Sequence, residues 1–177
     1  MRARQLVVMS LAVTMCTLAS CSDNSEPERN YAIPKDLCGI SIDSTLLTPF
    51  LPEGKSIVIR EEDPVPSQKN CQVNVDGKVA FIASQEWWED GDTLAQVAEG
   101  NPKLDGAEIS EDGRLIYSET GAVSSVDPCT SPDHPKYKLF TSIKAYADGR
   151  GSPDAMKRLV SAYTKAVKQS DTCTKPG

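Results

Sequence analysis

The chain has 177 residues, of which 39% are hydrophobic and 25% are charged, and its formal net charge at pH 7 is −6. This composition is typical of globular proteins, so it argues against disorder along the whole chain, and the length is sufficient for one domain with a core. The acidic balance and the lack of a basic cluster beyond the first residues argue against a nucleic-acid partner.

The first twenty residues have the pattern of a secretory signal. Arg2 and Arg4 come first, a mostly apolar run from Leu6 to Leu18 follows, and no acidic residue occurs. The run is too short for a good membrane span. It ends in Leu18-Ala19-Ser20-Cys21, which resembles a bacterial lipobox. That resemblance implies a signal peptide over residues 1–20, cleavage before Cys21 and acylation of the Cys21 thiol. We therefore expect a lipoprotein on the extracytoplasmic face of the cell membrane.

The segment after the lipobox is polar and acidic. Residues 21–30 contain no large apolar side chain, so we expect a flexible tether there. The rest of the chain, residues 31–177, predicts a single α+β domain. An acidic domain is repelled by an anionic leaflet, so the tether would hold it near the membrane but off its surface.

The first elements of the domain follow from capping residues and apolar spacing. Residues 43–52 predict a short helix that begins at Asp43, because its leucines and Phe50 gather on one side. Ser56 to Arg60 predicts a strand, and Glu61 to Lys69, which contains prolines, predicts a loop.

The clearest local signal is a hairpin around Asp76-Gly77, a dipeptide that favours a two-residue type I′ turn. Such a turn pairs Val75 with Lys78, Val73 with Ala80 and Cys71 with Ile82. The alternation then places one set of side chains on the core face: Cys71, Val73, Val75, Ala80 and Ile82.

The second half of the chain predicts further strands and two helices. Asp92 can cap a helix over residues 93–99, residues 107–118 predict a second hairpin, and residues 122–126 and 137–146 predict strands. Ser152 and Pro153 begin the last helix. Its apolar stripe is Met156, Leu159, Val160, Tyr163, Ala166 and Val167. Together these elements predict an α+β domain with a mainly antiparallel sheet of about five or six strands, on which a short N-terminal helix, a middle helix and a C-terminal helix pack.

Four cysteines remain in the exported domain once Cys16 is removed with the signal and Cys21 is acylated: Cys38, Cys71, Cys129 and Cys173. An even set in an exported protein indicates disulfides, and four cysteines allow three pairings. No C-x-x-C spacing occurs, so we expect neither a metal nor another cofactor. The favoured pairing is Cys38–Cys71, because Cys71 faces the core beside the first helix, with Cys129–Cys173, which would pin the last helix to the sheet.

Several segments resemble the small exported lipoproteins of actinobacteria, which have no assigned function. Besides the lipobox they are Leu37-Cys38-Gly39-Ile40, Leu51-Pro52-Glu53-Gly54-Lys55, Cys71-Gln72-Val73, Val75-Asp76-Gly77-Lys78, Glu86-Trp87-Trp88 and Asp154-Ala155-Met156-Lys157-Arg158. The likeness spans nearly all of the mature chain. It implies an envelope location and two disulfides, and it carries across no site residue other than the cysteines.

The only histidine is His134, so any Ser-His-Asp or Cys-His machinery would have to use it. It lies in Ser131-Pro132-Asp133-His134-Pro135, whose prolines indicate an exposed loop. No G-x-S-x-G occurs either. We therefore expect a solvated loop histidine and no catalytic residue.

The candidate ligand-binding residues are Glu86, Trp87, Trp88, Glu89 and Asp90. Adjacent tryptophans on a strand point to opposite faces, so one of them could lie on the surface beside carboxylates. Indole faces stack on sugars or bind cations, and paired carboxylates serve glycoside hydrolysis or hold calcium. The spacing does not fit an EF-hand loop. The simpler interpretation is a strand end whose second tryptophan packs under the next helix.

Three functional hypotheses follow. The first is a non-enzymatic binding or interaction module at the cell envelope, bound to the membrane through the lipid on Cys21, whose partner is an envelope protein or a cell-wall ligand. The alternative is a carboxylate-dependent, glycoside hydrolase-like enzyme that acts on cell-wall polymers around Trp87 and Trp88. The third is a structural spacer with no ligand.

Overall fold

The computed structural model of the chain describes residues 28–147 and 149–174. The predicted signal peptide over residues 1–20, the acylated Cys21 and most of the predicted tether over residues 21–30 lie outside the described residues. Arg29 is the first described residue with a partner in the domain, since it forms a bridge with Gly54 and donates a hydrogen bond to the carbonyl oxygen of Leu51.

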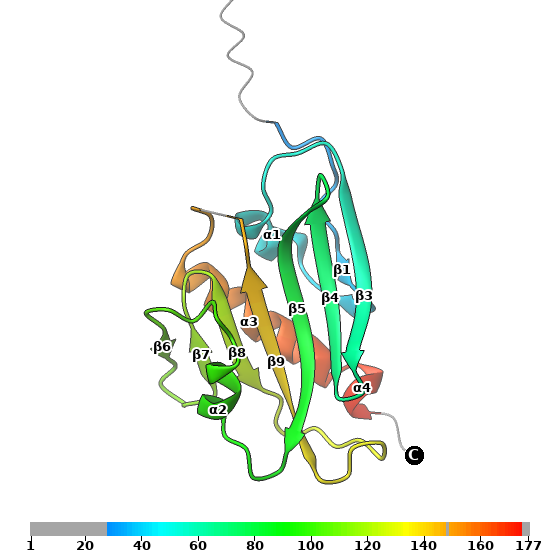
Figure 1. Cartoon of the computed structure of the whole chain (residues 1–177), viewed down its shortest axis with the longest axis vertical. Helices are drawn as coiled ribbons and strands as arrows, with labels where there is room; N and C mark the ends of the chain where they lie inside the picture. Colours follow the sequence, from blue (N-terminus) through cyan, green and yellow to red (C-terminus); the bar gives the residue numbers. More distant parts are fainter. Residues whose placement is uncertain (1–27, 148, 175–177) are drawn as a thin grey trace, which may run out of the picture.

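A seven-stranded antiparallel sheet forms the centre of the fold, and a separate pair of two-residue strands lies near its β3–β4 side (Figure 1). The order of the large sheet is β3-β4-β5-β9-β8-β7-β6. The strands are β1 (Asp36–Leu37), β2 (Ile40–Ser41), β3 (Ile57–Val65), β4 (Gln68–Val75), β5 (Lys78–Glu89), β6 (Glu108–Ile109), β7 (Leu115–Tyr117), β8 (Gly121–Ser125) and β9 (Tyr137–Ala145). The predicted α+β class is confirmed, and the sheet has more strands than expected.

The helices lie on both faces of the sheet rather than on one. The helix α3 (Pro153–Lys168) crosses one face and contacts β7, β8 and β9, whereas α2 (Leu94–Glu99) lies on the other face (Figure 1). The helix expected over residues 43–52 consists of α1 (Ser44–Leu47) and the 3-10 turn η1 (Thr48–Phe50), with a proline at the start of the turn. A last short helix, α4 (Asp171–Thr174), was not predicted.

Two apolar clusters result from this arrangement, one on each face of the sheet. The larger lies between the sheet and the helices α1 and α3 and includes fully buried Phe81, Leu159 and Tyr163. The smaller lies under α2 and contains Val97, Val123 and Phe140 as its buried members. All elements, both clusters and both disulfides lie within residues 28–174, so a domain that begins at Glu28 holds every interaction described here.

The hairpin at Asp76-Gly77 forms, but its register shifts by one residue beyond the turn. Val75 pairs with Lys78 as predicted, and an irregularity follows in which Ala80 is the extra residue. Val73 therefore pairs with Phe81 and Cys71 with Ala83, not with Ala80 and Ile82. The predicted core face is wrong at Ile82, which is half-buried on the opposite face, while Phe81 and Ala83 are buried in the larger cluster. A bulge overrides the register that the turn sets.

The segment predicted as a loop after Arg60 is instead the second half of β3. This strand continues to Val65 and pairs with β4 up to Gln68, with an irregularity between Glu62 and Val65. Because β3 is an edge strand, Pro64 removes no hydrogen bond that the sheet needs.

The two main helices begin at capping side chains. Thr93, not the predicted Asp92, caps α2: its hydroxyl oxygen accepts from the backbone N–H of Gln96, whose side-chain oxygen accepts from the N–H of Thr93. This reciprocal pair is a capping box. Ser152 caps α3 as predicted. The predicted apolar stripe of α3 is buried except for Ala166, which is half-buried.

The disulfides pair Cys38 with Cys71 and Cys129 with Cys173, at Cα–Cα distances of 5.7 and 4.9 Å. Both distances lie in the ordinary range for disulfides. The first joins the β1–β2 segment to β4, and the second joins the loop before β9 to α4. Both pairs are those that the order of the elements favours.

Asp76 predicts a measurable pH dependence of stability. Its carboxylate accepts hydrogen bonds from the backbone N–H groups of Lys55 at 3.0 Å and Ser56 at 2.9 Å, and these bonds lower the pKa of Asp76 below its ordinary value. A depressed folded-state pKa contributes stability above the unfolded-state pKa of about 4, and this contribution is lost as the pH falls through the folded-state pKa. Asp76→Asn keeps a residue suited to the turn and removes the titration.

We therefore expect the urea midpoint of the native chain to fall more steeply below about pH 4 than that of Asp76→Asn. Asp63→Asn, an exposed carboxylate of the edge strand, is the control and should follow the native chain. Parallel curves for the native chain and Asp76→Asn would show that this carboxylate does not couple folding to pH.

Candidate functional site

An open hollow of about 480 Å³ lies at one end of the sheet and contains four of the five candidate ligand-binding residues. Glu86, Trp87, Trp88 and Glu89 line it, whereas Asp90 does not. The other lining residues are Val65, Ser67, Gln68, Asp92 and Tyr137. The sequence indicated the strand that carries this site, but not the residues that complete it.

The hollow exists because β5 is longer than its neighbour β4. Pairing with β4 stops at Gln68, which lies opposite Glu86, and the backbone N–H of Trp87 donates to the carbonyl oxygen of Ser67 at 2.8 Å. On its other side, β5 stays paired with β9 as far as Glu89 and Tyr137. The last residues of β5 are therefore held by β9 on one side, while their other edge is open beyond Trp87.

Trp87 lies on the same face of the sheet as α3, at the margin of the larger apolar cluster. The ring of His134 stacks on it at 4.7 Å between centroids, and the ring of Tyr137 meets His134 edge-on at 5.9 Å. His134 lies in the loop before β9, as expected, but it is half-buried in a row of three rings rather than fully solvated. Tyr137 is the most open ring of the row, with 40% of its surface exposed.

Trp88 lies on the opposite face and packs under α2, with Phe140 and Leu94 in the smaller cluster. Its indole N–H donates to a carboxylate oxygen of Glu86 at 3.4 Å. The two tryptophans therefore alternate as predicted, and the simpler interpretation of the second one is confirmed. Both still border the hollow, one on each side of the strand end.

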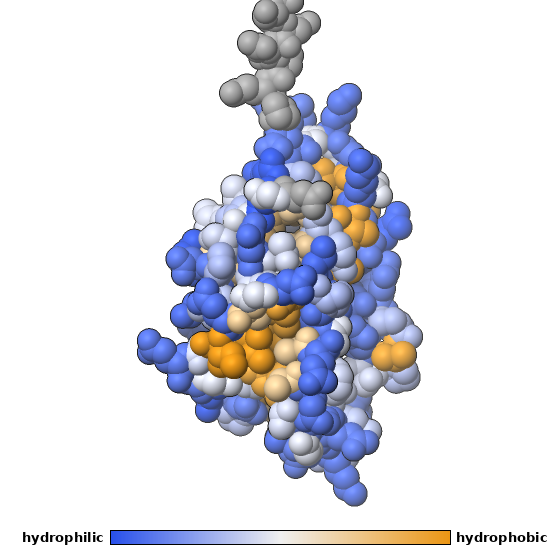
Figure 2. Space-filling view, turned by 60° about the vertical axis from the view of Figure 1, so that its left-hand side comes forward, coloured by the Kyte–Doolittle hydropathy of each residue, from blue (hydrophilic) through white to orange (hydrophobic). Residues whose placement is uncertain are grey.

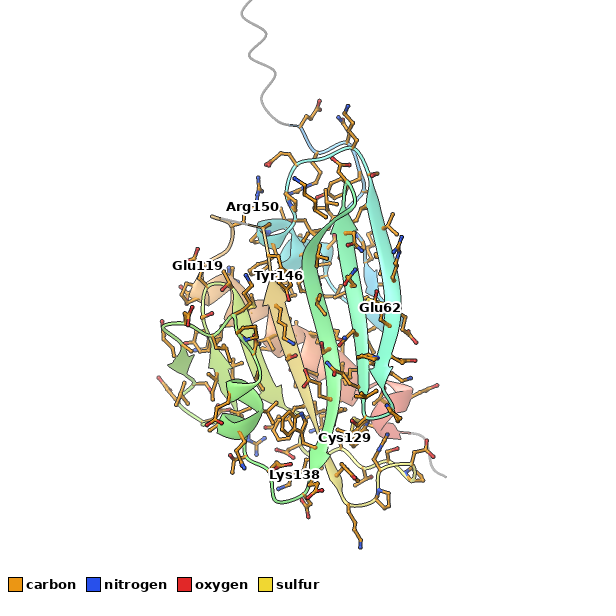
Figure 3. All side chains as sticks on the ribbon, in the orientation of Figure 1. Glu62, Glu119, Cys129, Lys138, Tyr146 and Arg150 are labelled. Atoms are coloured by element: carbon orange, nitrogen blue, oxygen red, sulfur yellow. A yellow bond between two sulfur atoms is a disulfide. The ribbon has the colours of Figure 1, made fainter. Side chains whose placement is uncertain are left out.

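The carboxylates do not form a facing pair. Glu86 shares the face of Trp88, where its other oxygen accepts from the hydroxyl of Ser142 at 2.5 Å, while Glu89 shares the face of Trp87. Asp90 forms an ion pair with Lys138 at 3.2 Å, at the end of β9 where Figure 3 labels Lys138. Glycosidases need two carboxyl groups that flank one bond. Glu86 and Glu89 leave β5 in opposite directions, which is a poor arrangement for that chemistry.

Within the described residues, no group of three or more His, Cys, Asp or Glu side chains is placed to hold a metal ion. No helix of the described part of the chain is long and apolar enough to cross a membrane. Comparison with known proteins finds no matching family model, no similar curated protein and no similar solved structure.

Proposed function

We propose that the protein is a non-enzymatic, lipid-anchored binding module on the extracytoplasmic face of the cell membrane, and that the hollow at the end of β5 is its binding site. One observation carries the proposal: an open strand end, paired with β9 along one edge, gathers Trp87, Trp88 and Tyr137 with the acceptor groups of Glu86 and Glu89. The lipobox-like Leu18-Ala19-Ser20-Cys21 supports the anchor, and the two disulfides suit an oxidising compartment outside the cytoplasm.

The lining groups indicate the chemistry of the ligand. Carboxylates only accept hydrogen bonds, and aromatic faces favour C–H-rich sugar faces or cations. The ligand should therefore present hydroxyl or ammonium donors to the hollow. In the envelope, such groups belong to cell-wall saccharides or to a basic segment of a membrane-associated protein.

The saccharide class can be tested by intrinsic fluorescence. The chain has only two tryptophans, and both line the hollow, so their emission reports on this site alone. Addition of soluble peptidoglycan fragments to the full chain should change the emission in a saturable way. Tyr137→Ala should weaken binding about tenfold, because it removes an open aromatic contact.

Tyr146→Ala is the matched control, since Tyr146 is 37% exposed, close to the 40% of Tyr137, and does not line the hollow. It should leave the affinity unchanged. A saturable signal that both variants weaken equally would place binding elsewhere, and no signal at all would reject the saccharide class.

The hydrolase hypothesis instead predicts enzymatic activity that depends on the two glutamates of the hollow. If Glu86 and Glu89 served as acid and base, Glu86→Gln or Glu89→Gln would abolish release of reducing sugars from cell-wall polymer. We expect no release by the native chain. Should release occur, Asp90→Asn is the control, because Asp90 pairs with Lys138 and does not line the hollow. Loss of release in both glutamine variants but not in the control would establish the enzyme.

A further inference from the structure

A second open hollow, a groove of about 610 Å³, lies between α3 and the strands β7 and β8 and shares no lining residue with the first. One wall is α3, which presents Lys157, Ser161 and Lys165 at four-residue spacing and so on one side of the helix. Arg114, the residue immediately before β7, also lines the groove.

The helix wall of this groove is basic in an otherwise acidic protein. The helix α3 contains four of the chain's 19 Lys and Arg residues, Lys157, Arg158, Lys165 and Lys168, and one acid, Asp154, whereas the whole chain has a net charge of −6. Three of these four basic residues line the groove.

Most of the cations that line the groove form no ion pair within the described residues. Across residues 28–147 and 149–174, no carboxylate lies within ion-pair distance of Arg114, Lys157 or Lys165. The Lys157 ammonium instead lies 5.3 Å from the ring centroid of Tyr117, and Lys168 donates to the backbone carbonyl oxygen of Asp127 at 2.7 Å.

The acids that border the groove are Glu111, Asp112 and Asp127. Hydrogen bonds from the hydroxyl of Ser110 and the backbone N–H of Arg114, together with the charge of Arg114, lower the pKa of Asp112, so this acid partly offsets Arg114. Lys157 and Lys165, in contrast, have no carboxylate within ion-pair distance in the described residues.

The groove also contains the side chain of a serine that is mostly buried. Ser124 of β8 is 7% exposed and lines the groove, and its side chain makes no hydrogen bond within the described part of the chain. Beside it on the same face, Thr141 and Thr164 are hydrogen-bonded to each other at 2.6 Å. The Ser124 hydroxyl oxygen is not one of the fully enclosed unpaired side-chain atoms of the described residues, so it opens into the groove and can donate a hydrogen bond to a ligand there.

We propose that this groove binds a phosphate-bearing anion, with Arg114, Lys157 and Lys165 supplying charge and Ser124 supplying a hydrogen bond from its hydroxyl. Phosphate offers several acceptor oxygens to cations on two walls, which is the arrangement that Arg, Lys and hydroxyl groups favour. The phosphate could belong to a soluble compound or to the headgroup of an anionic phospholipid. This inference does not depend on the function proposed for the first hollow.

The test uses the domain that begins at Glu28, labelled with ¹⁵N, and inorganic pyrophosphate as the probe. Amide shifts should cluster at Ser124, Ser161 and Thr164, while tryptophan emission stays constant. The double variant Lys157→Gln/Lys165→Gln should weaken binding about tenfold or more. Its control, Lys35→Gln/Lys69→Gln, changes the net charge equally at exposed sites outside the groove and should bind like the native domain.

A second arm distinguishes the sources of phosphate. Vesicles of phosphatidylcholine with phosphatidylglycerol are compared with vesicles of phosphatidylcholine alone. Vesicle binding that needs phosphatidylglycerol and is lost only in the groove variant assigns a headgroup, and pyrophosphate binding without vesicle binding assigns a soluble ligand. Binding of neither probe, shifts outside the groove, or equal losses in both double variants would overturn the proposal.

Discussion

Replacing Cys38 and Cys71 together by serine should lower the free energy of unfolding by about 4 kcal/mol. The bridge joins residues 33 apart in the chain, so the unfolded state gains the entropy of a long open loop when it is removed. Cys71 is only 3% exposed and belongs to the larger apolar cluster, so a serine hydroxyl there adds a desolvation cost. Urea unfolding of the native chain and the double variant measures the difference.

The second bridge provides the control. Cys129→Ser/Cys173→Ser opens a loop of 44 residues, and the entropic cost should again be about 4 kcal/mol. Cys129 and Cys173 are only partly buried, so the added desolvation cost should be smaller than at Cys71. A loss below about 1 kcal/mol for the first pair would contradict its role as a constraint on the unfolded chain.

Leu159→Ala should destabilise the domain by about 2–5 kcal/mol. Leu159 is 0% exposed, and it lies on the side of α3 that packs against the sheet. Its neighbours Met156 and Tyr163 are also fully buried and are held by the strands below, so the cavity cannot close completely. Thermal and urea unfolding measure the loss.

The matched variant is Leu46→Ala on α1, where the same side chain is only half-buried at the margin of the same cluster. It should lose less than half as much stability as Leu159→Ala. Equal losses would mean that the contact between α3 and the sheet is not the main source of stability in this cluster.

The elements that could be predicted from the sequence are those fixed by local chemistry. The Asp76-Gly77 turn, the Ser152 cap and the stripe of α3 each depend on residues a few positions apart. The register beyond Ala80 could not be predicted, because a bulge depends on the packing of Phe81 against elements distant in sequence. The strand order, with β9 between β5 and β8, likewise has no local signal.

The same distinction applies to the candidate site. The alternation of Trp87 and Trp88 follows from strand geometry and could be predicted. The stacking of His134 on Trp87 could not, since it requires that β9 pair with β5 and bring the preceding loop beside it. The groove is lined by residues of α3, β7 and β8, which are distant in sequence. The four-residue spacing of Lys157, Ser161 and Lys165 was therefore the only signal of it in the sequence.

The claim that the hollow at the end of β5 is a binding site is tested most directly in intact cells. The photoreactive residue p-benzoylphenylalanine is introduced at Tyr137 in the full chain and, separately, at Tyr146. Both positions are similarly exposed, and they lie at opposite ends of β9, with Tyr146 labelled at the far end from Lys138 in Figure 3. Most of the surface in the view of Figure 2 is hydrophilic, and its main apolar area lies on the side of the molecule that carries α2, β6 and β7.

Irradiation should produce a discrete covalent adduct at position 137 and none at position 146, and the mass of the adduct should identify a saccharide or a protein partner. An adduct at position 146 alone, equal capture at both positions, or no adduct at position 137 would contradict the account.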